Sequence, residues 1–267
     1  MTRRRKKRSA RNGRQAGTEQ VAFPQLERKV LHNRFAPVEP LDDEQIHTIH
    51  EATMTLLEEQ GIEVLGDMAL DTFRAAGAEV DDEGIVRMDR AMVMETIASA
   101  PSSFEVMSRN EENTLHVGRD VINFGMVSGP PNVHDCVNGR RMGNIADFKN
   151  LVRLGQFFNV ITFFGNQATA PTDLPVNTRH LDTLLASITE SDKPFFSTGI
   201  GAGRVMDAAN MCAIARGMSV EDLAQSPSAM TNINVNSPRK LDDSMAYGAM
   251  QLAALNQPVV VTPFTLM

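Results

Sequence analysis

The sequence predicts an α/β fold in which a small helical N-terminal layer precedes a (β/α)8 TIM barrel truncated to about five βα units. Five short apolar runs alternate with amphipathic helical segments in the later part of the chain. Their starts are separated by 38, 35, 35 and 29 residues, at Val121, Asn159, Pro194, Ala229 and Pro258. Such a barrel has about 30 residues per unit, and parallel strands covered on both faces are continuously apolar.

Charge divides the chain. Residues 1–20 are predicted to be a disordered basic tail, because MTRRRKKRSARNGR holds eight Lys and Arg and no acid. The remaining 253 residues are acidic, with 18 basic and 33 acidic side chains. The tail has no aromatic residue and no apolar stripe, so no nucleic-acid partner is expected, although it could dock on an acidic partner. Residues 21–105 are predicted to form the helical layer, and residues 106–267 the incomplete barrel domain.

Three helices are predicted in the N-terminal layer. The first lies in LDDEQIHTIHEATMTLLEEQG, where Asp42 is placed as N-cap, Gly61 as stop, and the apolar residues fall on one face. The segments DMALDTFRAAG and DRAMVMETIASAP predict two shorter helices. His47 and His50 lie in the first helix without the residue order of a zinc protease, so no metal site is predicted there.

In the barrel region, helices are predicted at residues 146–157, 177–190, 204–217 and 242–256. The first strand interval is the longest because it contains VHDCVNGRRMG, where Asn138-Gly139 suits a type I′ turn and predicts an inserted hairpin. An open doubly wound sheet is the alternative architecture. It would cover its last strand with a helix from the same chain, whereas QPVVVTPFTLM closes this chain. We therefore expect a truncated barrel that lacks about three βα units.

Composition also bears on the compartment. No apolar stretch is long enough to cross a bilayer or to act as a signal-peptide core, so a cytoplasmic protein without membrane association is expected. Cys136 and Cys212 are too far apart in sequence for a Cys-pair metal motif.

Amide side chains follow the predicted strands at the barrel mouth, where polar groups form ligand sites. Three asparagines of AMTNINVN alternate along one strand and should project to one face, either binding a ligand or forming a hydrogen-bond ladder. The hairpin adds a His-Asp pair, for which a turn hydrogen bond is the alternative. The predicted substrate-binding residues are Asn166, Gln167, Asn232, Asn234, Asn236, Asp135 and His134.

A glycine-rich loop, PFFSTGIGAGR, follows the third apolar run. Gly199, Gly201 and Gly203 could form a nucleotide or S-adenosylmethionine loop, but the spacing is G-x-G-x-G rather than G-x-G-x-x-G. A barrel βα turn is the competing interpretation.

Four segments together resemble the trimethylamine:corrinoid methyltransferase family, in its order and spacing, from about Leu41 onward: SGPPNVHDCVNGRRMG, SDKPFF, NVNSPRKLDDSM and NQPVVVTPFTLM. The resemblance implies a TIM barrel that transfers a methyl group from a tertiary or quaternary methylated amine to the Co(I) of a corrinoid protein. The corrinoid cofactor would be carried by that partner, with none bound directly by this chain. Family members are about twice as long, which supports the truncation. Because an open five-strand arc leaves two sheet edges unpaired, the fragment is expected to be inactive alone. The full-length protein is expected to be a homo-oligomer. The pyrrolysine used by founding members would lie beyond Met267.

The chemistry agrees with the residue pattern. A quaternary nitrogen leaves as a neutral amine, so no general acid is needed and no catalytic residue is predicted. Amides and phenylalanines would hold the cation. Two alternatives stay open: an S-adenosylmethionine- or nucleotide-binding enzyme that uses the Gly199–Gly203 loop, and a non-catalytic protein that binds a quaternary amine.

Overall fold

The computed structural model describes residues 23–262. The basic tail predicted for residues 1–20 and the last residues of QPVVVTPFTLM lie outside this range, so the structure does not test those predictions. Within the described range, no helix combines the length and apolar character needed to cross a membrane.

The N-terminal region contains the three predicted helices, α1 (Asp43–Thr55), α2 (Asp67–Ala75) and α3 (Arg90–Ala98). Asp42 caps α1 as predicted, because its carboxylate accepts from the Gln45 N–H at 2.8 Å. A π-helical turn, η1 (Leu56–Gln60), extends α1 to Gly61, whose φ of +66° ends the helix.

This region also contains a sheet that the sequence did not predict. Its strand order is β14-β2-β4-β3, with bounds Lys240–Leu241, Ile62–Val64, Ile85–Arg87 and Glu79–Val80. Because β14 belongs to the predicted barrel region, the two regions share one sheet and one core around Val64 and Val86.

Five parallel strands in the later part of the chain lie side by side in chain order. Their pairings run β8-β11 and β12-β13-β15, and a parallel bridge between Phe164 and Phe195 joins the two groups. The bounds are Gly125–Met126, Phe163–Phe164, Phe196–Ser197, Met230–Ile233 and Val259–Val261. Each of the five predicted apolar runs therefore supplies one strand of this arc. The sheets of residues 23–262 do not close on themselves, and the complete eight-stranded barrel stays a prediction.

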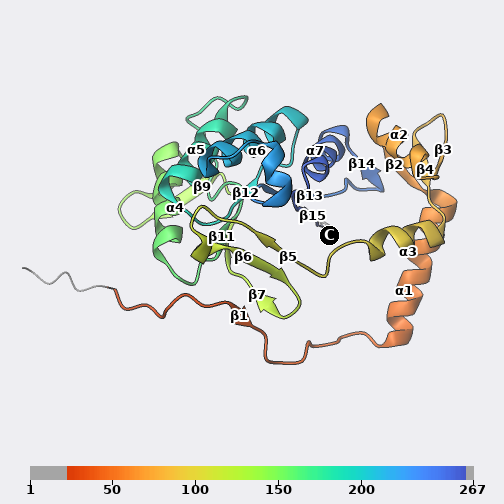
Figure 1. Cartoon of the computed structure of the whole chain (residues 1–267), viewed down its shortest axis with the longest axis horizontal. Helices are drawn as coiled ribbons and strands as arrows, with labels where there is room; N and C mark the ends of the chain where they lie inside the picture. Colours follow the sequence, from red (N-terminus) through yellow and green to blue (C-terminus); the bar gives the residue numbers. More distant parts are fainter. Residues whose placement is uncertain (1–22, 263–267) are drawn as a thin grey trace, which may run out of the picture.

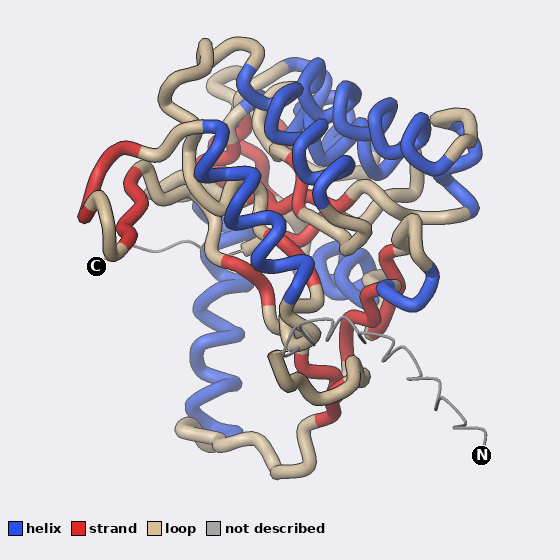
Figure 2. Tube along the Cα trace, turned by 90° about the vertical axis from the view of Figure 1, so that its left-hand side faces the viewer, coloured by secondary structure: helices blue, strands red, loops and turns tan. Residues whose placement is uncertain are grey.

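Four long helices cover one side of the arc, and Figure 1 shows them in succession along that side. They are α4 (Ile145–Phe157), α5 (Arg179–Glu190), α6 (Ala202–Arg216) and α7 (Asp243–Ala254), with the short helix η3 (Glu221–Gln225) after α6. Figure 2 shows the same arrangement from a second side, with helices outside and strands within. Phe164 and Phe195 are buried in the core between the helices and the arc.

A hairpin of β5 (Ser103–Val106) and β6 (Leu115–Gly118), with η2 (Glu111–Asn113) between its strands, packs on the opposite side of the arc. Val106 and Leu115 are buried against Met230, Phe163 and Phe196. This apolar layer therefore covers the inner side of the arc around Met230.

The strand predicted to start at Val121 is confirmed only in its second half. Val121–Ile122 forms β7, which pairs antiparallel with β1 (Leu31–His32), and only Gly125–Met126 joins the arc. The inserted hairpin is confirmed as β9 (Asn132–Asp135) and β10 (Gly139–Met142).

The predicted type I′ turn is wrong. A type I′ turn needs positive φ at both central residues, whereas Gly139 has φ +66° and Asn138 is not among the positive-φ residues. Asp135 pairs with Gly139, so three residues connect the strands instead of two.

Candidate functional site

The inner side of the arc has an aromatic floor. The rings of Phe163 and Phe196 meet edge to face with centroids 5.5 Å apart, and Met230 packs beside them. Phe163 pairs with Gly125 across the strands, and a Cβ at Gly125 would lie 2.3 Å from that ring. The glycine therefore allows the ring to lie over β8. A floor of this kind presents ring quadrupoles that attract a cation.

One predicted amide lies directly above this floor. Asn232 is two residues after Met230 in β13, so both side chains project to the same face. Asn232 is exposed there, and its register partner on β15 is Val260. The Thr262 hydroxyl donates a hydrogen bond to Asn232 Oδ1. This bond leaves the Asn232 Nδ2–H groups as the donors that the inner face presents.

The other two asparagines of the predicted row do not share its geometry. Strand β13 ends at Ile233, so Asn234 and Asn236 lie beyond it, and the prediction that all three side chains project to one face of a single strand is wrong. Asn236 instead closes a turn with Lys240, and its Nδ2 donates to Asp242 Oδ2 at 3.2 Å. Asp242 is the N-cap of α7, so Asn236 supports the start of that helix.

Asn166 and Gln167 follow the end of β11, as predicted, and both are half-buried. The backbone of Gln167 ties this loop to the segment after β8: its carbonyl accepts from the Gly129 N–H at 2.7 Å, and its N–H donates to Ser128 Oγ at 3.3 Å. Within residues 23–262, the two side-chain amides form no hydrogen bond, so they stay candidates for a ligand.

The structure gives Asp135 a turn-forming role. Its Oδ1 accepts from the backbone N–H groups of Val137 at 2.9 Å and Asn138 at 2.7 Å, and the Asn138 side chain also donates to it. These bonds, led by that from the Asn138 N–H, lower the pKa of Asp135 to about 2. His134 is exposed on the other face of the hairpin.

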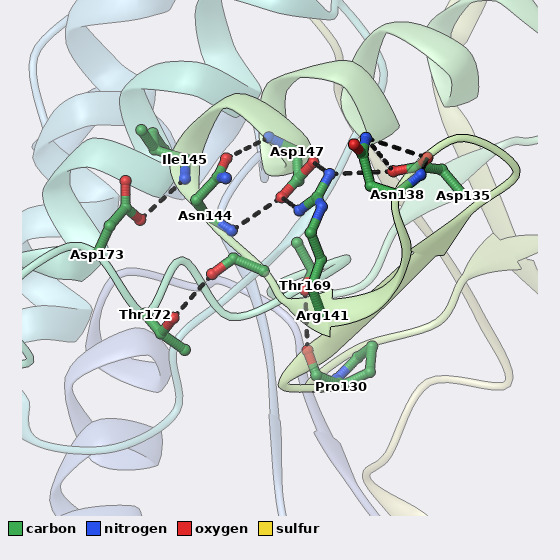
Figure 3. Close-up of polar contacts among 11 residues, drawn as sticks. Pro130, Asp135, Asn138, Arg141, Asn144, Ile145, Asp147, Thr169, Thr172 and Asp173 are labelled. Carbon is green, nitrogen blue, oxygen red and sulfur yellow. Dashed lines mark hydrogen bonds and ion pairs between the residues drawn. The ribbon is translucent and has the colours of Figure 1, made fainter.

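An ion-pair network that the sequence did not reveal fixes this hairpin at the rim of the arc (Figure 3). The Arg141 guanidinium binds both carboxylate oxygens of Asp147, with Nη2 2.7 Å from Oδ1, and also reaches Asp135 Oδ2 at 3.1 Å. Asp147 is in the first turn of α4, where it completes a capping box with Asn144. Arg141 lowers the pKa of Asp147, and Asp147 raises that of Arg141.

The base of the hairpin is attached to the loop after β11 as well. Thr169 Oγ1 and the Ala170 N–H both donate to the Pro130 carbonyl, at 3.1 and 2.9 Å. The N–H and hydroxyl of Thr172 donate to the Gly143 carbonyl at 3.0 and 2.9 Å. Two neighbouring rim segments therefore hold each other in place (Figure 3).

The glycine loop connects β12 to α6. Gly201 is the N-cap of α6 with φ +85°, and no side chain caps this helix. A Cβ at Gly199 would lie 2.5 Å from the Asn232 carbonyl oxygen, so close packing on β13 accounts for that glycine. This contact favours the βα-turn interpretation.

No group of three or more His, Cys, Asp or Glu in the described part of the chain is placed to hold a metal ion. Thr262 is not among the residues predicted from the sequence, although its position two residues after Val260 is a usable signal, because period-2 alternation puts both on the face of Asn232. Arg141 and Asp147 are not among them either, because their pairing depends on how the hairpin folds back on α4.

The comparisons with known proteins agree with the resemblance. The model of the trimethylamine methyltransferase (MTTB) family matches residues 4–267. The chain belongs to this family.

Two relatives of this family member come from Desulfitobacterium hafniense. A glycine betaine methyltransferase of strain Y51 is 32% identical over 221 residues, which cover 83% of this chain and 46% of the relative. A trimethylamine methyltransferase MttB of strain DSM 10664 / DCB-2 is 34% identical over 87 residues, or 31% of this chain and 18% of the relative. The chain thus spans about half the length of the glycine betaine methyltransferase.

Proposed function

We propose that the protein to which this chain belongs transfers a methyl group from a methylated amine to the corrinoid of a carrier protein. Family membership supports the methyl transfer. The observation that carries the proposal is the aromatic floor of Phe163 and Phe196 beneath the oriented amide of Asn232. An aromatic surface and a neutral donor suit a cation that carries no exchangeable proton.

In this proposal the residues of the chain bind and orient the substrate. The methylammonium group rests on the rings of Phe163 and Phe196, and Asn232 Nδ2 donates to an acceptor group of the substrate, such as a betaine carboxylate. A Co(I) corrinoid supplies a strong nucleophile when its carrier is bound. The C–N bond breaks toward nitrogen, which keeps the electron pair, so a neutral amine leaves and no proton is transferred. We propose in addition that a carrier protein holds the corrinoid, that the full-length protein closes its barrel, and that the protein is cytoplasmic.

The test measures methyl transfer from glycine betaine or trimethylamine to free cob(I)alamin. The readout is the absorbance change that accompanies formation of methylcobalamin. Asn232→Ala in the full-length protein should lower kcat/KM for glycine betaine about tenfold or more, because a donor to its carboxylate is lost. Asn210→Ala is the matched control, since Asn210 is exposed on α6 and, within residues 23–262, donates only to the Met206 carbonyl. Transfer from neither amine by the unaltered protein would refute the proposed function.

A further inference from the structure

The β9–β10 hairpin is rigid at its base but free at its tip. Its strands are held by the ion pairs of Arg141 and by the contacts of Pro130 and Gly143 with the loop after β11. Its closing loop projects from the body near α4 (Figure 1). Val137 at the tip is 90% exposed, and its backbone N–H donates to Asp135 Oδ1 at 2.9 Å.

The two faces of the hairpin differ in environment. Val133, Asp135 and Arg141 lie on one face and are half-buried, since Arg141 binds α4. Alternation places His134, Arg140 and Met142 on the other face, where all three are exposed. We call this face, together with Val137, the outer hairpin surface.

The outer hairpin surface is basic and apolar. Among the described residues Arg140 forms no ion pair, whereas the acids of the hairpin region, Asp135 and Asp147, both bind Arg141 from the inner face. Met142 is 54% exposed. A guanidinium beside exposed apolar side chains is the composition of protein contact surfaces, and its charge selects an acidic partner.

The location of this surface decides which partner fits. The hairpin follows the carboxyl end of β8, and its base is bonded to the loop after the carboxyl end of β11. In-line methyl transfer requires the acceptor atom to come within bonding distance of a substrate held on the inner side of the arc. A protein that carries the acceptor must therefore cover these carboxyl ends, where the hairpin is a projecting element (Figure 1).

We propose that the outer hairpin surface is the docking site for the methyl-acceptor carrier protein, which presents an acidic patch with an apolar contact to Arg140 and Val137. This inference rests on the proposed function. It assigns the hairpin to carrier binding and not to substrate binding, the role predicted from the sequence for His134 and Asp135.

The experiment compares two acceptors, the carrier protein and free cob(I)alamin, in the full-length enzyme. Arg140→Glu and Val137→Asp should each raise KM for the carrier about tenfold or more, through lost charge and apolar contact. Transfer to free cob(I)alamin should change less than about twofold, because that acceptor needs no docking surface. Arg119→Glu and Val38→Asp are matched controls, since both residues are exposed and lie outside the hairpin.

Each other outcome overturns the inference. Unchanged KM for the carrier would show that the carrier binds elsewhere. Equal losses with both acceptors would place the hairpin in substrate binding or stability. A change in oligomeric state by light scattering would identify the surface as a contact between copies of the chain. In each of these cases, transfer to free cob(I)alamin by the unaltered enzyme would leave the proposed function intact.

Discussion

Gln257 is the residue whose loss should destabilise the protein most clearly. Its side chain is 4% exposed and forms four hydrogen bonds. Oε1 accepts from the N–H groups of Ser228 and Ala229 at 2.9 and 3.0 Å, and Nε2 donates to the carbonyls of Leu223 and Leu255 at 2.7 and 2.8 Å. The amide thus joins η3, the start of β13 and the end of α7.

Gln257→Leu keeps the size of the side chain and removes all four bonds. The N–H groups of Ser228 and Ala229 and the Leu255 carbonyl then lose their partner, at about 1.5–2 kcal/mol each, whereas the Leu223 carbonyl still accepts from the Ser226 N–H at 3.0 Å. Leucine regains about 1–2 kcal/mol through apolar burial. We expect a net loss of about 3–5 kcal/mol in the free energy of unfolding, a large part of the 5–15 kcal/mol typical of a domain.

Urea unfolding followed by far-UV circular dichroism measures this loss, since the sequence has no Trp. Gln225→Leu is the matched control, because Gln225 is exposed and forms no side-chain hydrogen bond in the described range, so its change should stay within about 0.5 kcal/mol. A loss below about 1 kcal/mol for Gln257→Leu would refute the reasoning.

Three further predictions concern stability. Burial, followed by the charge of Arg28, lowers the pKa of Lys193 from 10.5 to about 8. Below about pH 8 the buried ammonium therefore lowers the free energy of unfolding, and this penalty disappears as pH rises toward 10.5. The unaltered protein should therefore gain about 3 kcal/mol relative to Lys193→Met between about pH 7 and about pH 11 in urea unfolding, and parallel pH profiles would contradict this. Gly125→Ala should lower the free energy of unfolding by about 1–3 kcal/mol, because the new Cβ meets the Phe163 ring. Gly203→Ala is the control and should be neutral or stabilising, because no atom lies within 4 Å of its Cβ. Equal melting temperatures of the two variants would disprove the contact. Asp42→Ala should cost about 1 kcal/mol through loss of the α1 N-cap, measured by thermal unfolding, and no change would show that the cap is dispensable.

Periodicity predicted the order of the elements well. All five apolar runs supply a strand and all four helices between them are present, because alternating burial leaves a direct trace in sequence. Periodicity could not give strand ends. The row of asparagines continued the alternation past Ile233, but the chain leaves the sheet there to form the Asn236–Lys240 turn.

The candidate site was less predictable because its side chains meet through tertiary contacts. Asn232 was predicted, but the orientation of its amide depends on Thr262, which comes from another strand. Asn138-Gly139 indicated the hairpin correctly and its turn type incorrectly, since the Asp135 carboxylate binds the turn N–H groups and stabilises a longer connection.

The placement of β14 beside β2 limits how this protein can be divided genetically. Lys240 and Leu241 align with Glu63 and Val64, and Arg239 donates to the Gly61 carbonyl at 3.0 Å. Expression of residues 21–105 alone would leave the edge of β2 without its neighbour and part of the apolar surface around Val64 in water. The two halves of such a split should therefore be recovered in soluble form only when they are produced together.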